Sequence, residues 1–132
     1  MNPVFKKHII LIIEDEISLR TVLRDKFTRE NFFVLDAKDG EIGLSTAQRE
    51  QPHIIILDRV MPKMDGMTML KNLRAGNEWS KNVPIIFLTN LGNDDKIISK
   101  EITDDKNTHY LIKSDMAIND LVEKVREILS LT

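Results

Sequence analysis

Short apolar runs alternate with longer amphipathic stretches along this chain, and four of the runs end in polar residues suited to metal or phosphate. The runs and the residues that follow them are 9–13 before Glu14 and Asp15, 54–57 before Asp58, 85–88 before Thr89, and 110–112 before Lys113. Runs this short and this rich in β-branched residues predict buried strands of a parallel sheet. Parallel strands share one carboxyl-end edge, so these polar residues are expected to meet where open α/β folds bind ligands.

The stretches between the runs have the spacing of amphipathic helices. In the first half of the chain we expect a strand at about 7–13, a helix at about 16–30, a strand at 32–37, a helix at about 40–50 and a strand ending at Asp58. A loop to Gly66 then leads to a helix carrying Met67, Leu70 and Leu73. The second half continues with a strand opened by Pro84, a weakly anchored helix at 93–106, a strand ending at Lys113 and a helix at about 118–129. Five strands alternating with five helices predict a three-layer α/β sandwich of (βα)5 type.

Two of the predicted helices have apolar positions that should face the sheet. They are Leu19, Val22, Leu23 and Phe27 in the helix at 16–30, and Ile42 and Ala47 in the helix at 40–50.

The length and composition of the chain predict one domain over residues 1–132, with a core at about 7–131 and no output domain. The 19 Lys and Arg residues nearly balance 21 Asp and Glu residues, so no overall field favours nucleic acid or an anionic membrane. The absence of cysteine excludes disulfides and cysteine-based zinc sites. No apolar run is long enough for a signal peptide or a membrane span, so a cytoplasmic protein is expected.

The polar residues that follow the strands suggest metal-assisted phosphate chemistry. Crowded carboxylates at Glu14, Asp15 and Asp58 repel one another, and a hard cation such as Mg²⁺ relieves that repulsion. A carboxylate can also act as a nucleophile and form an acyl phosphate. Lys113 offers a charge for phosphoryl oxygens and Thr89 offers a hydroxyl donor. Taken singly, each acid could instead cap the following helix, but four coordinated strand ends favour a site.

The sequence resembles the receiver domain of two-component response regulators. The resemblance is carried by Glu14-Asp15, by residues 58–66 (Asp-Arg-Val-Met-Pro-Lys-Met-Asp-Gly), by residues 86–89 and by residues 110–113, in the family's order and spacing. It implies a doubly wound, flavodoxin-like sheet with strand order 2-1-3-4-5, whose switch point lies between the first and third strands. Those strands deliver the predicted acidic cluster.

The resemblance also implies a role for each residue of the predicted site. Asp58 would accept the phosphoryl group, and Lys113 would pair with it. Asp15, Asp58 and the backbone carbonyl of Val60 would ligate Mg²⁺, while Glu14 would act largely through bound water.

Thr89 and Tyr110 match the positions that respond to phosphorylation in this family. Thr89 would hydrogen-bond the phosphoryl group, and Tyr110 would rotate as Thr89 moves, although a plain exposed aromatic is the alternative for Tyr110. The face formed by residues 93–131 would then change and be read by a partner.

The resemblance to receivers also implies partners for this chain. The expected partners are a histidine kinase or phosphotransfer protein and a downstream effector protein, with no direct contact to nucleic acid or membrane. The chain would be a monomer or a phosphorylation-dependent dimer.

The chain departs from the usual receiver pattern at three places. Ser114 replaces the proline that normally follows the lysine, so Ser114 or Asp115 could cap the final helix. Asn90 replaces a small residue after the threonine, and polar residues at 105–108 replace a Gly-Ala pair. These departures are expected to alter the rates of phosphorylation or hydrolysis.

Three functions remain in competition. The leading hypothesis is a stand-alone receiver that catalyses only its own phosphorylation and dephosphorylation and is not otherwise an enzyme. The second is a pseudo-receiver, a protein-binding adaptor that has lost efficient phosphorylation. The third, an aspartyl-nucleophile phosphatase, is disfavoured because Val60 stands where those enzymes need a second acid two residues after the nucleophile.

Overall fold

The computed structural model describes residues 7–90 and 105–131. The helix predicted at 93–106 lies outside the described residues apart from its last two positions. The described elements are β1 (Ile9–Ile13), α1 (Ile17–Arg29), β2 (Phe33–Ala37), α2 (Gly40–Glu50), β3 (Ile54–Asp58), α3 (Gly66–Arg74), α4 (Glu78–Asn82), β4 (Ile85–Thr89), β5 (Thr108–Ile112), the 3-10 helix η1 (Lys113–Asp115) and α6 (Ile118–Ile128).

The five strands form one parallel sheet in the order β2-β1-β3-β4-β5. This confirms the predicted fold class and strand order. Strand β1 pairs with β2 on one side and with β3 on the other, which places the switch point between β1 and β3. The carboxyl ends of β1 and β3 therefore lie side by side.

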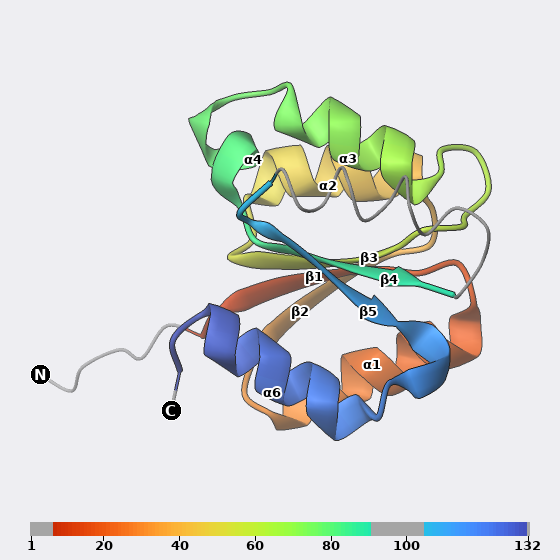
Figure 1. Ribbon diagram of the computed structural model, residues 1–132, viewed down its shortest axis with the longest axis vertical. Helices are drawn as coiled ribbons and strands as arrows, with labels where there is room; N and C mark the ends of the chain where they lie inside the picture. The colour runs from red at the N-terminus through yellow and green to blue at the C-terminus, as the bar shows by residue number, and fades with distance from the viewer. Residues whose placement is uncertain (1–6, 91–104, 132) are drawn as a thin grey trace, which may run out of the picture.

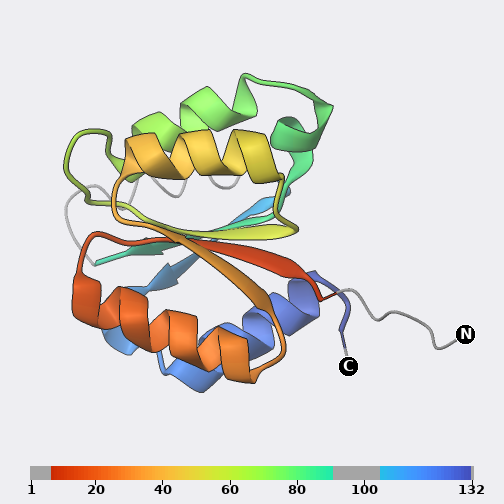
Figure 2. The same ribbon diagram turned by 180° about the vertical axis from the view of Figure 1, so that it is seen from behind.

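Helices cover both faces of the sheet and complete three layers (Figures 1 and 2). Because successive strand residues point to opposite faces, the apolar runs divide between two cores. Ile10, Ile12, Ile54 and Ile56 pack with α1 and α6, whereas their neighbours Leu11, Ile13, Ile55 and Leu57 pack with α2 and α3. The three inner strands are buried on both faces, which explains why their sequences are continuously apolar.

The structure corrects three of the predictions. Val22 and Ile42 were expected to face the sheet, but they are 45% and 40% exposed. Leu23, Phe27 and Ala47, which were predicted to face the sheet as well, are buried as expected. The short helix α4 was not expected. Finally, α6 begins at Ile118 after Ala117, so neither Ser114 nor Asp115 occupies its cap position.

Among the described residues, none of the helices has the length and apolar character needed to cross a bilayer.

Candidate functional site

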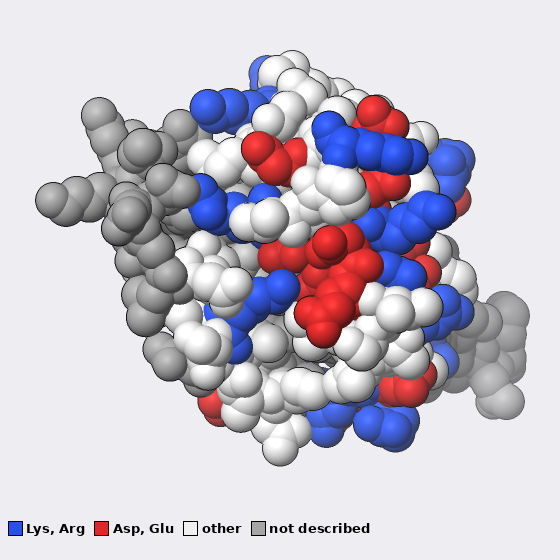
Figure 3. Space-filling view, turned by 90° about the vertical axis from the view of Figure 1, so that its right-hand side faces the viewer, with Lys and Arg blue, Asp and Glu red and all other residues white. Residues whose placement is uncertain are grey.

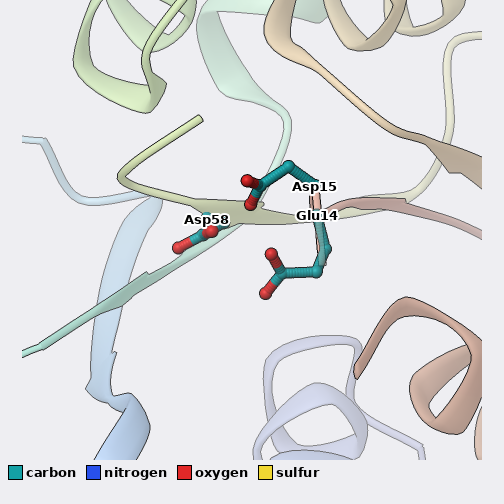
Figure 4. Close-up of side chains that lie close together, drawn as sticks. All are labelled: Glu14, Asp15 and Asp58. Atoms are coloured by element: carbon teal, nitrogen blue, oxygen red, sulfur yellow. The ribbon is translucent and has the colours of Figure 1, made fainter. Parts of the chain in front are cut away.

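Three carboxylates gather where β1 and β3 end (Figure 4). Glu14 and Asp15 follow β1 directly, and Asp58 is the last residue of β3. One oxygen from each of the three lies within 4.8 Å of the others, and no other group of three or more His, Asp or Glu side chains among the described residues meets this condition. Glu14 and Asp58 are buried, at 1% and 4% exposure, while Asp15 is exposed.

Lys113 brings a positive charge to the two buried carboxylates. It stands immediately after β5, and its Nζ lies 2.8 Å from Glu14 Oε1 and 3.2 Å from Asp58 Oδ1. Three strand ends, those of β1, β3 and β5, therefore supply one site. Figure 3 faces this edge of the sheet and shows acidic side chains gathered at its centre with basic side chains around them.

The crowding of these charges changes two pKa values. Burial raises the pKa of Glu14, and a hydrogen bond with Asp58 raises it further, so that it reaches about 7 although Lys113 lowers it. For Lys113, burial lowers the pKa, but the hydrogen bond to Glu14 and the charge of Asp58 outweigh burial and raise it overall. The ammonium form of Lys113 is thus the favoured form beside the acids.

The loop after Asp58 turns back tightly onto the end of β3. The amide of Arg59 donates to Leu88 of β4 at 3.0 Å, and the amide of Gly66 donates to the carbonyl of Arg59 at 2.8 Å. A Cβ at Gly66 would overlap the backbone of Asp58 and Arg59, so this close return requires glycine. Val60 lies in this loop, and its side chain is exposed.

Thr89 and Tyr110 lie on neighbouring strands near the site. Thr89 ends β4 and is buried, and its hydroxyl donates to the carbonyl of Asn90 at 3.1 Å. Tyr110 lies on the edge strand β5, opposite Phe87, and is 44% exposed. The hydroxyl that would contact a phosphoryl group is thus hydrogen-bonded to local backbone in this structure.

Two of the departures from the receiver pattern have a structural explanation. The bond between Lys113 and Ser114 is a trans peptide and lies within η1, which begins at Lys113. The polar residues before β5 bind Arg74 of α3, which donates to Asp105, Asn107 and Thr108. That cluster lies at the amino end of β5, away from the acidic site.

Some residues that shape the site were missed from the sequence. Asp39 and Asp65 cap α2 and α3 by accepting from the amides of Ile42 and Thr68, both at 2.8 Å. An Asp-Gly pair before a helical stretch is the signal that could have revealed both caps. Arg20 of α1, which binds the loop carrying Glu14, has no comparable signal, because the groups that it contacts there are backbone carbonyls, which every residue carries.

The donor set fits a hard divalent cation. When all three carboxylates are ionised, Lys113 balances only one of them, and Mg²⁺ would balance the remaining charge. Carboxylate and carbonyl oxygens are the ligands that Mg²⁺ prefers, and it commonly uses one or two carboxylates together with water or phosphate. The exposure of Asp15 leaves such an ion open to solvent and to a phosphate ligand.

A model of the response regulator receiver domain family matches residues 10–126. The chain belongs to this family. Receiver domains are modules of two-component, phosphorelay signalling rather than conventional enzymes.

Three similar proteins show how far the likeness extends. A probable transcriptional regulator, ycf27, of Guillardia theta is 35% identical over 127 residues, which cover 96% of this chain and 47% of that protein. The sporulation initiation phosphotransferase F of Bacillus subtilis (strain 168) is 32% identical over 117 residues, which cover 87% of this chain and 90% of that protein. The structure of the chemotaxis response regulator CheY4 of Vibrio cholerae has a TM-score of 0.81 and 26% identity, covering 93% of this chain and 99% of that one.

The ycf27 proteins of Guillardia theta, Porphyridium aerugineum and Cyanophora paradoxa are longer than the region they share with this chain. The shared region covers 47%, 49% and 48% of their lengths, so the receiver chain spans about half of each.

Proposed function

We propose that this receiver domain accepts a phosphoryl group on Asp58 in an Mg²⁺-dependent reaction and thereby acts as a signalling switch. The observation that carries the proposal is the convergence of Glu14, Asp15, Asp58 and Lys113 at one end of the sheet. A histidine kinase or a phosphotransfer protein would supply the phosphoryl group.

The chemistry is a phosphoryl transfer to a carboxylate oxygen. An oxygen of Asp58 attacks the phosphorus of a phosphohistidine, the P–N bond breaks, and its electron pair stays on the imidazole nitrogen, which takes up a proton. Lys113 lies 3.2 Å from Asp58 Oδ1, where its charge can stabilise the transferring oxygens. Hydrolysis later breaks the new P–O bond by attack of water on phosphorus, which releases inorganic phosphate and restores the carboxylate.

Asp15, Asp58 and the backbone carbonyl of Val60 would hold Mg²⁺, and Glu14 would act through bound water. Bound there, Mg²⁺ supplies charge neutralisation for the phosphoryl oxygens. Burial of Asp58 and Glu14 keeps these groups in a fixed, poorly solvated arrangement, which strengthens their electrostatic interactions.

Switching would follow from new contacts made by the phosphoryl group. The Thr89 hydroxyl would exchange its bond to the Asn90 carbonyl for a bond to a phosphoryl oxygen, and Tyr110 would move with it. These contacts differ between the two states, which is the requirement for shifting a conformational equilibrium. The face within residues 93–131 would present the change to an effector protein.

The single-domain phosphorelay form of this function is part of the proposal. The likeness to the sporulation phosphotransferase supports it, since the chain matches 90% of that protein's length. The ycf27 regulators, in which the matched region is about half of the protein, support a receiver that controls a further domain. Transfer of the phosphoryl group from this chain to a phosphotransfer protein would favour the first form.

The test is intact mass spectrometry after incubation with acetyl phosphate and Mg²⁺. We expect one added phosphoryl group in the wild type, none in Asp58→Asn and none in EDTA. Asp65→Asn is a matched control, because Asp65 is an exposed acid in the same loop and asparagine keeps its cap. That variant should be labelled like the wild type.

The opposite result would change the function proposed. If the wild type gains no phosphoryl group, the alternative function is favoured, which is an adaptor that binds its partner without phosphorylation. If the Asp58→Asn variant still gains a phosphoryl group, another residue is the acceptor.

A further inference from the structure

Arg20 of α1 binds the loop that carries two of the three acidic residues. Its Nη1 donates to the backbone carbonyl of Glu14 at 2.8 Å and approaches the carbonyl of Asp15 at 3.5 Å. Its Nε lies 3.8 Å from Asp36 Oδ2 on β2. The Arg20 side chain is largely buried, with 16% of its surface exposed.

A contact to the Glu14 carbonyl fixes more than one atom. The peptide bond is planar, so holding the carbonyl oxygen of Glu14 also fixes the amide of Asp15 and the direction in which the chain enters Asp15. The exposed carboxylate of Asp15 has little packing to hold it in place. Its position therefore depends on the backbone, which Arg20 restrains.

The rest of the loop is anchored at Glu14 from other directions. The backbone amide of Glu14 donates to the carbonyl of Ala37 on β2 at 3.0 Å. The side-chain Oε2 of Glu14 accepts from the backbone amide of Glu16 at 3.2 Å. Arg20 holds the remaining backbone group of Glu14, its carbonyl. Together these contacts restrain both sides of the Glu14 backbone.

We infer that Arg20 is a positioning residue for the Mg²⁺ site, acting through the backbone of Glu14 and Asp15. The inference rests on the proposed function, because it concerns the metal of that same site. Arg20 would touch neither the metal nor the phosphoryl group.

Charge and position predict opposite effects for a substitution at Arg20. Removing a positive charge near a cation site strengthens cation binding by Coulomb's law. Releasing the loop that carries the ligands weakens binding, and loss of outer-shell partners of metal ligands typically costs about 10- to 100-fold in affinity. The sign of the change therefore separates a positioning role from a purely electrostatic one.

Arg24 offers a matched control on the same helix. It pairs with the same oxygen of Asp36, at 3.3 Å, and its side chain is more exposed than that of Arg20. Arg20→Met and Arg24→Met thus remove the same charge beside the same partner, while methionine keeps most of the apolar stem. Of these two arginines, Arg20 is the one placed against the Glu14 carbonyl.

The experiment is titration of Mg²⁺ into metal-free wild type, Arg20→Met and Arg24→Met by isothermal calorimetry. Amide hydrogen exchange of Asp15 and Glu16 is measured on the same samples in EDTA. We expect the Kd for Mg²⁺ to rise about tenfold in Arg20→Met, at the lower end of the range for outer-shell partners. Exchange at Asp15 and Glu16 should also become faster in that variant, and Arg24→Met should bind Mg²⁺ as tightly as the wild type or more tightly.

Two results would overturn the positioning role of Arg20, and a third would overturn the proposed metal site on which that role rests. An unchanged or lower Kd in Arg20→Met would overturn the positioning role, and so would an equal rise in both variants. A wild type that binds no Mg²⁺ would instead overturn the proposed metal site. If Arg20→Met does not fold, Arg20→Gln decides, because glutamine keeps a polar end but is two atoms shorter than the arm of Arg20 that donates to Glu14; a wild-type Kd there also overturns the role.

Discussion

The ammonium group of Lys113 lies 2.8 Å from the buried carboxylate of Glu14, and it bridges from there to Asp58 at 3.2 Å. Lys113 therefore offsets part of the repulsion between these two acids. A lysine that would contact the phosphoryl group also supports the resting state of the site.

Replacing Lys113 with methionine should separate these two effects. Without the competing ammonium group, the acidic site should bind Mg²⁺ several-fold more tightly, which calorimetry measures. The metal-free protein should lose about 1–3 kcal/mol of unfolding free energy, because two buried carboxylates lose a charged partner. Labelling by acetyl phosphate should become slower, since a charge beside the transferring oxygens is lost.

Lys63→Met is the control for Lys113→Met. It removes the same charge from the loop after Asp58, where Lys63 lies 3.8 Å from Asp39 and its side chain is largely exposed. Equal gains in Mg²⁺ affinity for the two variants would show that only net charge matters.

Gly66→Ala should weaken the acidic site, although Gly66 itself contributes no side chain to it. The new Cβ would meet backbone atoms of Asp58 and Arg59, which cannot turn aside as a side chain can. We expect weaker Mg²⁺ binding and slower labelling of Asp58. In Gly76→Ala the Cβ first meets the hydroxyl of Ser80, so that variant should change stability but keep Mg²⁺ affinity. Wild-type Mg²⁺ affinity in Gly66→Ala would show that the loop can relax without moving Asp58.

Arg74→Met should be strongly destabilising. The guanidinium group donates to Asp105, to the carbonyls of Ser80, Val83 and Asn107, and to the Thr108 hydroxyl, so the variant loses five hydrogen bonds. Loss of a largely buried, charge-assisted network costs about 3–5 kcal/mol, measurable by urea unfolding.

Arg49→Met is the control for Arg74→Met. Arg49 is an exposed arginine that pairs with the neighbouring Glu50, so its loss should cost less than about 1 kcal/mol. Similar losses in the two variants would contradict the importance of the buried network.

Asp105 should make the stability of the protein depend on acidic pH. Burial raises the pKa of Asp105, but the Thr108 hydroxyl, the Asn107 amide and the Arg74 guanidinium outweigh burial and hold it below its ordinary value of 3.8. The folded form thus binds fewer protons than the unfolded form. The contribution of Asp105 to the free energy of unfolding is complete above pH 3.8, the ordinary pKa. It is lost as the pH falls through the lower pKa of the folded form.

The measurement for Asp105 is urea unfolding of the wild type and Asp105→Asn across this pH range. The stability gap between them should be constant near neutral pH and shrink in acid. A gap that does not change with pH would show that the charge of Asp105 contributes nothing.

The fold and the acidic site were predictable because their signals are local. Each inner strand is a continuous apolar run, and each run ends at the polar residue that the structure places at the sheet edge. The outward-facing Val22 and Ile42 were mispredicted because an apolar residue next to the true helix stripe has the same local pattern as one within it. The η1 turn, which begins at Lys113, and the short helix α4 were missed for lack of strong periodicity.

The sequence by itself determined where the apolar strands lie along the chain, which polar residues end them and which family the chain resembles. The tertiary structure decided the contacts: Lys113 bridges Glu14 and Asp58, and Arg20 holds the Glu14 carbonyl. Arg74 contacts acceptors in α4, in the turn between α4 and β4, and in the turn before β5. Periodicity reports whether a side chain faces the core, because that depends on neighbours along the chain. Long charged side chains find partners on other elements and loops, and those partners come within reach only once the sheet has set the elements side by side.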